Sequence, residues 1–340
     1  MIPPEQSDLS AIMSWMERIR PSDLAQRFAR EGGFDAESFQ PCLPGFAGHI
    51  SAVDGSNAMV LESGSFSVAA VRAVETTFHL GARVHAGETP LRLVRIGPEK
   101  TNEGYEDLYF ECFGDDPLEP LENEDRSRAA AVLRDTLEYW TLSRVAAILG
   151  EGDVLLIDGT LRVNHGALRQ VMKRILTDAR RKGVHIAAVT KAATSTWGDG
   201  IPIVQSAEAL ARESGIHGPW YLEIPPHLLD AVHHREWHFE SVYVASLHRC
   251  SPRAFKVDLP EGCGTTEVSA VFSALSAYAD DGRVTGYPYP LFDAHRLAAI
   301  TADQTESVRQ ELRGRMAGMG MQESDYTSYF GDYHDEFARY

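Results

Sequence analysis

Apolar positions in the first half of the chain follow two periods, which predict strands and then one long helix. Short apolar or alternating runs are typical of strands, because successive side chains of a strand face opposite sides of a sheet. We interpret four such runs as an antiparallel meander: residues 49–53, 66–74, 91–96 and 105–113. From Arg126 to Leu149 the apolar residues recur at helical spacing instead, and Gly150 ends the predicted helix.

The second half of the chain alternates between strands and helices. Buried strands at 154–157 and 184–189 flank a helix that we predict from about residue 167 to 181. A strand, a helix and a strand in this order predict a right-handed crossover and a parallel pair. Further elements are expected as strands at 220–224, 241–246 and 254–257, and as helices at 266–279, 291–300 and 303–316. The pattern therefore predicts an α/β fold in which helices flank a mixed β-sheet.

Proline, glycine and charge mark the borders of this core. Residues 8–32 have a helical pattern interrupted at Pro21, and a Pro- and Gly-rich joint follows at 41–49. We divide the chain into three parts: an N-terminal helical arm (1–44), a core domain (45–318) and an acidic, aromatic C-terminal tail (319–340). The tail is either a peptide docked on the body or a partner-binding segment, and the residues leave both open.

The charge of the chain is strongly negative but unevenly placed. A net charge of −17 opposes a general nucleic-acid binder, because phosphate is repelled at long range. Residues 102–125 hold ten acidic side chains and no basic one, whereas the stretch from Arg162 to Lys182 holds seven Arg and Lys residues. An acidic chain can therefore still carry a basic groove.

Cysteine usage and hydropathy indicate the compartment. The four cysteines are scattered and no two share a C-x-x-C spacing, so neither a zinc knuckle nor a disulfide framework is supported. Scattered cysteines are typical of a reducing compartment. The N-terminus lacks the pattern of a signal peptide, and no uncharged apolar run approaches the roughly 18 residues of a membrane helix. We expect a cytoplasmic protein without a membrane segment.

Two Asp-Gly-[Ser/Thr] elements carry the candidate chemistry. Asp54 follows the apolar run of SAVDGS, and Asp158 follows that of LLIDGT. A carboxylate at the end of a buried strand lies at the rim of the sheet, and the following glycine lets the backbone turn away. Two such carboxylates placed side by side repel each other unless a divalent cation lies between them. Each element alone also fits an ordinary Asp-Gly turn after a strand, and this reading stays open.

The segment 286–296 adds a candidate histidine. Pro288 and Pro290 predict an extended entry into a helix. Asp293 and His295 are two positions apart, so they point to nearly opposite sides of that helix, and only one of them can face a metal site. The alternative is a structural or exposed histidine.

The sequence resembles the NurA nuclease family over roughly residues 46–316. The resemblance rests on four blocks in order: VDGS (53–56), LLIDGTL (155–161), VTKAATST (189–196) and GYPYPLFDAHRL (286–297). It implies an RNase H-like core, a homodimer, a requirement for manganese or magnesium, and partnership with the hexameric HerA ATPase in DNA end resection. It also implies 5′→3′ exonuclease and single-strand endonuclease activity at DNA, although the residues themselves set neither polarity nor strand preference.

The same resemblance assigns roles to individual residues. It makes Asp54 and Asp158 metal-ligating carboxylates, His295 a metal ligand or its close neighbour, and Tyr287 the active-site tyrosine. Glu138, on the long helix between the two aspartates, matches the order of carboxylates in RNase H-like nucleases and becomes the third carboxylate; periodicity alone favours a solvated flank residue. Carboxylates with one imidazole suit Mn²⁺ and still serve Mg²⁺.

Basic residues complete the expected site. Lys191 ends its strand beside the carboxylates and would hold a substrate phosphate as a point charge, or else is an ordinary surface lysine. Arg162, Lys173 and Arg174 of the basic stretch are the candidate DNA contacts.

Three other functions fit the sequence less well than a nuclease. His233, His234 and His238 include an i, i+4 pair, but no Glu or Cys completes a zinc pattern. LLIDGTL resembles half of the haloacid-dehalogenase phosphatase motif, in which a nucleophilic Asp stands where this chain has Leu156. A non-catalytic DNA-end or ATPase-docking subunit is the remaining alternative, and it does not account for the joint presence of Asp54, Asp158 and His295.

Overall fold

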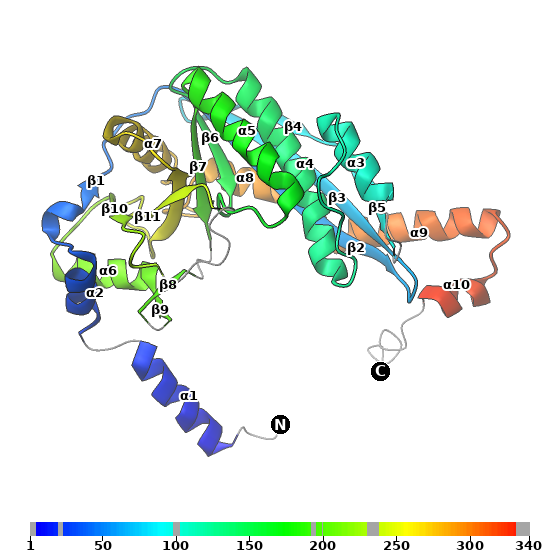
Figure 1. The fold of residues 1–340 in the computed structure, drawn as a ribbon, viewed down its shortest axis with the longest axis horizontal. Helices are drawn as coiled ribbons and strands as arrows, with labels where there is room; N and C mark the ends of the chain where they lie inside the picture. Colours follow the sequence, from blue (N-terminus) through cyan, green and yellow to red (C-terminus); the bar gives the residue numbers. More distant parts are fainter. Residues whose placement is uncertain are drawn as a thin grey trace.

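A large mixed sheet organises the structure, a computed structural model that describes residues 5–19, 23–97, 103–191, 195–198, 200–229 and 238–330 (Figure 1). Its strands are β1 (Gln40–Pro41), β2 (His49–Glu62), β3 (Ser67–His79), β4 (Ala82–Glu88), β5 (Arg92–Ile96), β6 (Val154–Asp158), β7 (His185–Thr190), β10 (Trp220–Ile224), β11 (Glu240–Ser246) and β12 (Phe255–Pro260). They lie in the order β1-β10-β11-β12-β7-β6-β2-β3-β4, and β5 pairs with β3. A separate two-stranded sheet joins β8 (Thr196–Trp197) to β9 (Ile201–Pro202).

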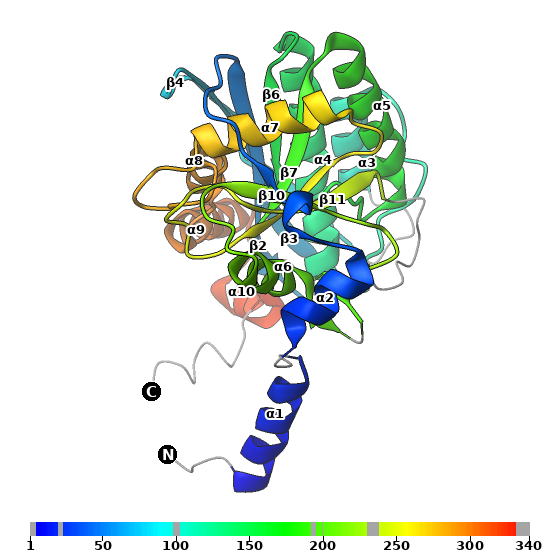
Figure 2. The same cartoon turned by 90° about the vertical axis from the view of Figure 1, so that its left-hand side faces the viewer.

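Helices cover both faces of the large sheet. One face is buried under α3 (Glu103–Phe113), α4 (Arg126–Ile148) and α5 (Gly166–Lys182), and the other under α7 (Thr265–Ala277) and α8 (Tyr289–Ala298). Toward the β10 and β11 end, α2 (Leu24–Gly32) packs on α6 (Ile203–Glu213). At the other end, α9 (Ala302–Gly318) and α10 (Glu323–Phe330) lie against the β2–β3 hairpin (Figure 1). The first helix, α1 (Gln6–Ile19), extends away from the body (Figure 2).

The connectivity of the central strands confirms the predicted RNase H-like fold. β2, β3 and β4 form an antiparallel meander, and α4 then leads to β6, which pairs with β2 in parallel. The crossover through α5 places β7 parallel to β6, as the strand–helix–strand pattern predicts. This arrangement places β6, the strand that follows α4, next to β2, the first strand of the meander.

The segment from Glu103 to Phe113 is a helix, so the strand predicted at 105–113 is wrong. Its alternating apolar residues also satisfy helical spacing, since Tyr105, Leu108 and Tyr109 are buried at positions i, i+3 and i+4. α3 packs these three side chains against α4 and β5, and this tertiary contact decides between the two periods. The strand β4 and the helix α6 were not predicted.

β2 also differs from its prediction, because it runs for 14 residues and passes straight through Asp54, Gly55 and Ser56. The expectation that Asp54 ends a strand is therefore wrong, whereas Asp158 does end β6. β3 pairs with β2 along nearly its whole length, which keeps the backbone extended beyond Asp54. β6 pairs only with the first part of β2, so Asp54 still lies where the parallel pairing stops.

The ends of the chain were predicted as separate parts, and those boundaries stay a prediction. Leu24, Ala25 and Phe28 of α2 are buried in a cluster with residues of α6, so part of the first 44 residues packs on the body. Within the described ranges, none of the helices combines the length and the apolar character that crossing a bilayer requires.

Candidate metal centre

Two carboxylates and one imidazole meet where β6 ends. Asp54 of β2, Asp158 of β6 and His295 of α8 each offer a ligand atom, and these atoms lie within 4.8 Å of one another. His295 Nδ1 is 2.7 Å from Asp54 Oδ2 and 3.9 Å from Asp158 Oδ2. The three residues come from segments more than 100 positions apart, and the fold brings them together.

The parallel register of β2 and β6 sets the distance between the aspartates. Val53 is paired with Ile157, so Asp54 and Asp158 are the next residues on two neighbouring strands. The two glycines that follow them have different roles. Gly159 adopts a positive φ of 115°, which an L side chain rarely takes, and turns the chain out of the sheet. Gly55 stays in the extended strand.

Gly55 is needed for close packing rather than for a turn. A Cβ atom at this position would lie 2.7 Å from Arg134 Cγ and 3.0 Å from Glu138 Oε2, both on α4. The absence of a side chain lets α4 bring Glu138 against the backbone beside Asp54. Because strand side chains alternate, Glu138 approaches β2 from the face opposite to that of Asp54 and His295.

α8 is held on β3 by contacts at both of its ends. Arg72 donates to the carbonyl oxygens of Ala298 and Ala299 at 2.8 and 2.6 Å, which satisfies free acceptors at the end of the helix. Thr76 donates to the carbonyl oxygen of Pro290 at 3.1 Å, at the start of the helix. These contacts hold the helix in the orientation that directs His295 toward Asp54.

The rotation of α8 agrees with the prediction that Asp293 and His295 face opposite sides. Asp293 is 1% exposed and forms ion pairs with Arg83 at 2.8 Å and Arg296 at 3.0 Å. The side chain of His295 is 55% exposed and contacts both aspartates. The geometry therefore selects His295 as the candidate ligand from this helix.

The electrostatics of the site favour a cation. Burial and the nearby Asp158 carboxylate raise the pKa of Asp54, and the hydrogen bond from His295 opposes this shift. Burial, followed by the charges of Asp135 and Asp54, raises the pKa of Glu138 well above its usual value. Burial and neighbouring carboxylates thus destabilise the ionised forms of Asp54 and Glu138, and a divalent cation would relieve the repulsion between the carboxylates. The donor set and its charge fit such an ion.

Lys191 and Tyr287 both contact Asp158. Lys191 Nζ forms an ion pair with Asp158 Oδ2, and the Tyr287 hydroxyl donates to Asp158 Oδ1 at 3.2 Å. Burial and the Asp158 charge raise the pKa of Tyr287 well above its usual value, so its hydroxyl stays protonated and remains a donor. Lys191 Nζ also lies 5.7 Å from the centre of the Tyr287 ring, within range of a cation–π contact.

Glu138 lies next to this group without joining it. Its carboxylate interacts electrostatically with both Asp54 and Asp158, but it is outside the set whose ligand atoms approach within 4.8 Å. Arg134 Nε is 3.9 Å from Glu138, and Arg134 Nη2 is 2.6 Å from Asp135. Arg134 was not predicted as part of the site. Its only sequence signal is the i, i+4 spacing to Glu138, which is common on helices.

Comparison with known proteins identifies the family to which this fold belongs. The family model of the NurA domain matches residues 48–300. The chain belongs to the NurA family. The structure is similar to the NurA nuclease of Sulfolobus solfataricus, with a TM-score of 0.58 and 13% identity over 95% of this chain and 99% of that one. A second crystal structure of NurA has a TM-score of 0.54 and 11% identity, covering 92% and 98% of the two chains. A search of curated protein sequences found no match.

The NurA fold gathers most of the predicted site residues and leaves others outside. Lys191, Tyr287 and His295 each contact Asp158, and His295 also contacts Asp54. The candidate DNA contacts are exposed residues beyond this cluster: Arg162, Lys173 and Arg174. Of the block VTKAATST, residues 192–194 lie outside the described residues, as do His233 and His234 of the histidine cluster.

Part of the basic stretch serves the fold rather than a groove. Arg180 donates to the carbonyl oxygens of Glu261 and Gly262 at 3.2 and 2.8 Å. Lys182 donates to the carbonyl oxygen of Ala146 at 3.1 Å and so caps the end of α4. These two cations are therefore occupied, which reduces the basic surface that the stretch can offer to a ligand.

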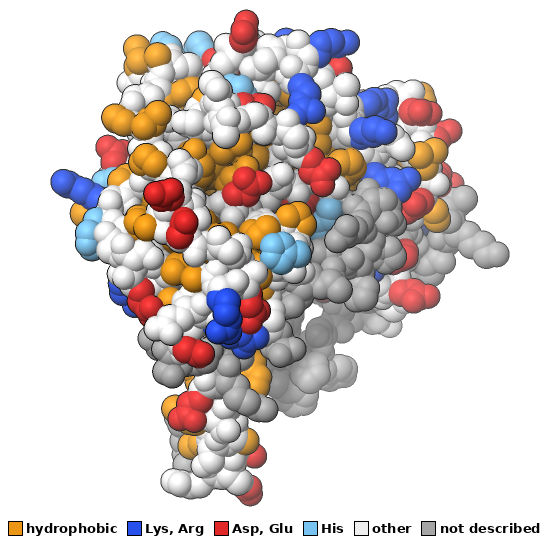
Figure 3. All heavy atoms as spheres, turned by 60° about the vertical axis from the view of Figure 1, so that its left-hand side comes forward, with side chains coloured by type: hydrophobic (Ala, Val, Ile, Leu, Met, Phe, Trp, Pro, Cys, Tyr) orange, Lys and Arg blue, Asp and Glu red, His pale blue; other side chains and the backbone are white. Residues whose placement is uncertain are grey.

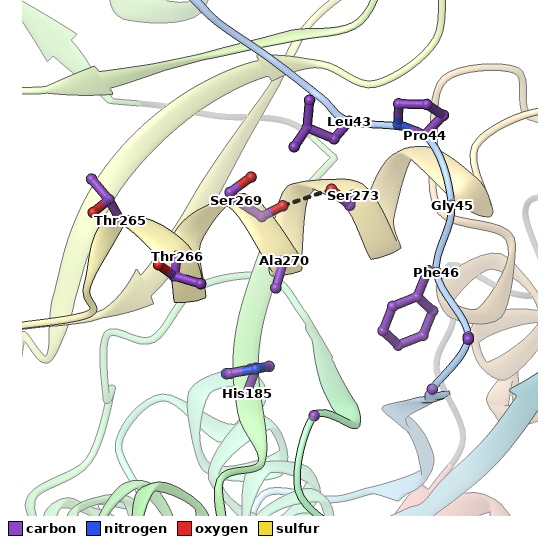
Figure 4. A pocket seen from close by; sticks show the side chains of 13 residues that line it. Leu43, Pro44, Gly45, Phe46, His185, Thr265, Thr266, Ser269, Ala270 and Ser273 are labelled. Atoms are coloured by element: carbon purple, nitrogen blue, oxygen red, sulfur yellow. Dashed lines mark hydrogen bonds between the residues drawn. The ribbon is translucent and has the colours of Figure 1, made fainter.

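A recess of about 740 Å³ lies at the other end of the same strands. Gly48 and Gly152 precede β2 and β6, His185 begins β7, and hydroxyl-bearing residues of α7 form its wall (Figure 4). Its lining includes no Asp, Glu, Lys or Arg. On the face drawn in Figure 3, hydrophobic side chains gather near the middle with acidic ones among them, and Lys and Arg are fewer there. The recess lacks the carboxylates on which the chemistry of the metal centre depends.

Proposed function

We propose that the chain is a metal-dependent DNA nuclease, a hydrolase of phosphodiester bonds at DNA ends. The observation that carries this proposal is the convergence of Asp54, Asp158 and His295 within 4.8 Å, on an RNase H-like sheet of a NurA family member. Two solved NurA structures share the fold, and one of them is described as a nuclease.

Asp54, Asp158 and His295 would hold the metal. Two carboxylates and an imidazole suit Mn²⁺ and still serve Mg²⁺. A bound divalent cation supplies positive charge for the attacking and leaving oxygens of a phosphodiester and lowers the pKa of water. Glu138 is the fourth candidate ligand, because its buried carboxylate interacts with both aspartates and has no cation nearer than Arg134 among its described ion pairs.

The other residues act on the substrate or on the carboxylates. Lys191 is a flexible point charge beside Asp158, and a substrate phosphate would compete for it. Tyr287 keeps its proton, so it donates to Asp158 and fixes the direction of that carboxylate. His295 Nδ1 lies 2.7 Å from Asp54 Oδ2, so the imidazole is already placed beside the carboxylate with which it would share the metal. The contacts of Lys191 and Tyr287 with Asp158, and of His295 with Asp54, preorganise two acidic side chains that would otherwise repel each other.

We further propose that the protein acts in DNA end resection with a HerA-type ATPase, as a homodimer in the cytoplasm. A net charge of −17 gives the chain little long-range attraction for DNA, so delivery by a partner would supply the affinity it lacks. An exposed apolar stripe on α1 supports a contact with another chain: Leu9, Ile12, Met13, Trp15 and Met16. The four cysteines are unpaired, which agrees with a reducing compartment. The family resemblance implies 5′→3′ polarity.

Digestion of end-labelled DNA tests the proposal against its alternatives. Cleavage with Mn²⁺ or Mg²⁺, none with EDTA, and no hydrolysis of a small phosphate monoester are the expected results. Hydrolysis of the monoester alone would favour a phosphatase, although Leu156 is fully buried where that chemistry needs a nucleophilic Asp. No cleavage under any condition would favour the non-catalytic subunit.

A further inference from the structure

The loop that follows Asp158 is fixed by the two strands beyond β6. The Gly159 N–H donates to the carbonyl oxygen of Val189 at 3.0 Å, and Thr190 Oγ1 donates to the carbonyl oxygen of Gly159 at 2.5 Å. Both partners belong to β7, so the loop crosses the end of that strand. The loop then reaches β12, where a buried carboxylate accepts hydrogen bonds from it.

That carboxylate belongs to Asp258, which is 0% exposed and lies 97 to 99 positions after residues 159–161 of the loop in sequence. Its Oδ2 accepts a hydrogen bond from Thr160 Oγ1 at 2.7 Å and from the Leu161 N–H at 3.3 Å. Its Oδ1 accepts from Lys256 Nζ at 2.5 Å, and the Lys256 side chain is only 8% exposed. The carboxylate therefore holds two consecutive residues of the loop with one oxygen and a buried cation with the other.

The Thr160 hydroxyl is constrained in both of its roles. It donates to Asp258 and accepts from the Arg162 N–H at 3.1 Å. A hydroxyl has a single proton to donate, so the contact with Asp258 fixes its direction. Asp158 is two residues away, immediately before the positive-φ turn at Gly159. The position of Thr160 thus limits how far the Asp158 backbone can move.

A buried ion pair contributes little net free energy to the stability of a loop. Desolvation of the two charges offsets much of their attraction, and apolar residues of similar volume often stabilise a fold as well or better. A fully hydrogen-bonded charge does, however, define the direction of its partners. Residues that hydrogen-bond to the segment carrying a metal ligand fix the orientation of that ligand. Their loss typically weakens metal binding by about 10- to 100-fold.

We propose that Asp258, neutralised by Lys256, is a positioning residue that acts through Thr160 to hold Asp158 in the orientation required for metal binding. The inference deepens the proposed function and rests on Asp158 being a ligand. It assigns a distinct task to each residue of the second Asp-Gly-Thr element: the carboxylate binds, the glycine turns the chain, and the hydroxyl anchors it to β12.

Thr160→Val removes the anchoring hydroxyl at nearly constant volume and is the main variant. Thr160→Ser keeps the hydroxyl and is the rescue, and Asp258→Asn tests the other partner. Thr77→Val is the matched control, because Thr77 is buried in the same sheet and forms a 2.8 Å hydroxyl contact with Ser51 that does not involve the loop.

Two measurements on the full chain decide the proposal. Calorimetric titration with Mn²⁺ alone should show about tenfold weaker binding for Thr160→Val and Asp258→Asn, and wild-type affinity for Thr160→Ser and Thr77→Val. Hydrogen–deuterium exchange without metal should show faster exchange at residues 159–161 in Thr160→Val, with β7 unchanged. A purely structural role would lower the thermal midpoint of Thr160→Val and Thr77→Val alike without separating their Mn²⁺ affinities.

Each outcome has a defined meaning. Unchanged Mn²⁺ affinity and unchanged exchange in Thr160→Val would overturn the positioning role while leaving the proposed function intact. If the wild type binds no Mn²⁺, the proposed metal centre fails, and the exchange measurement still decides the anchor: faster exchange at 159–161 supports it and unchanged exchange removes it.

Discussion

Separate replacement of His295 and Asp293, two residues of α8, should show that one is needed for DNA cleavage and the other for the stability of the fold. The side chain of His295 is 55% exposed, so His295→Ala removes few packing contacts; it does remove the contact with the buried Asp54 carboxylate and should lower the free energy of unfolding by about 1 kcal/mol. It also removes one of the three groups that converge on the metal centre. Loss of a group that merely supports a ligand costs up to about 100-fold, so we expect cleavage to fall by at least about 100-fold.

Asp293→Ala should have the opposite profile. It breaks the pairs with Arg83 and Arg296, but these two arginine side chains are 44% and 53% exposed and can be rehydrated. We therefore take the low end of the range for hydrogen bonds to charged groups, about 2 kcal/mol in all. For a chain of 340 residues that corresponds to a fall of about 3 °C in the thermal midpoint. Cleavage by the folded protein should stay within about tenfold of wild type.

Thermal unfolding and cleavage of end-labelled DNA at saturating Mn²⁺ measure the two effects on the same preparations. The control for His295→Ala is a thermal midpoint within about 2 °C of the wild-type value. Asp293→Ala is assayed well below its own midpoint, so that any loss of cleavage does not come from unfolding. The reverse ranking, in which Asp293→Ala abolishes cleavage and His295→Ala retains it, would show that α8 does not present His295 to the site.

Three further outcomes are expected. Gly55→Ala should destabilise the protein by about 1–3 kcal/mol and lower cleavage, because the new Cβ meets Arg134 and Glu138 of α4. Gly64→Ala, with open space around the new Cβ, should leave stability and cleavage unchanged, and equal effects of the two substitutions would refute the packing argument. Tyr287→Phe should lower cleavage about tenfold with the fold intact, since Asp158 loses a donor, and wild-type rates would contradict this role. DNA binding by the protein without a partner should be weak, and the slope of the log binding constant against log salt concentration should be shallower than about −3. Nanomolar binding at physiological salt with a steeper slope would contradict delivery of DNA by a partner.

The candidate site was largely accessible from the sequence because its carboxylates follow apolar runs. An apolar run followed by Asp-Gly marks Asp158 at the end of β6, and the same pattern marks Asp54. The prolines at the start of α8 mark the helix that carries His295. The role of Gly55 leaves no such pattern. Its sequence context is nearly the same as that of Gly159, yet one glycine makes room for α4 and the other makes a turn. Only the packing of a distant helix separates the two.

Features that depend on long-range contacts escaped prediction for the same reason. In the α3 segment, strand and helix periods both fit, and burial of Tyr105 and Leu108 against α4 decides between them. Lys256 and Asp258 alternate along β12 as charged residues on a solvated strand face do, but a loop about 100 residues earlier covers them. Burial of a charge is a property of the assembled fold, so local sequence gives no sign of it.

The most direct test of the account is the dependence of DNA cleavage on Mn²⁺ concentration in the wild type and in Asp158→Asn. The substitution preserves the shape of the side chain and removes one of the two negative charges of the candidate metal centre. We expect the wild type to cleave end-labelled DNA with saturable dependence on Mn²⁺, and Asp158→Asn to remain folded with no measurable cleavage at any Mn²⁺ concentration. Cleavage by Asp158→Asn at a rate near that of the wild type, with the same Mn²⁺ dependence, would contradict the account.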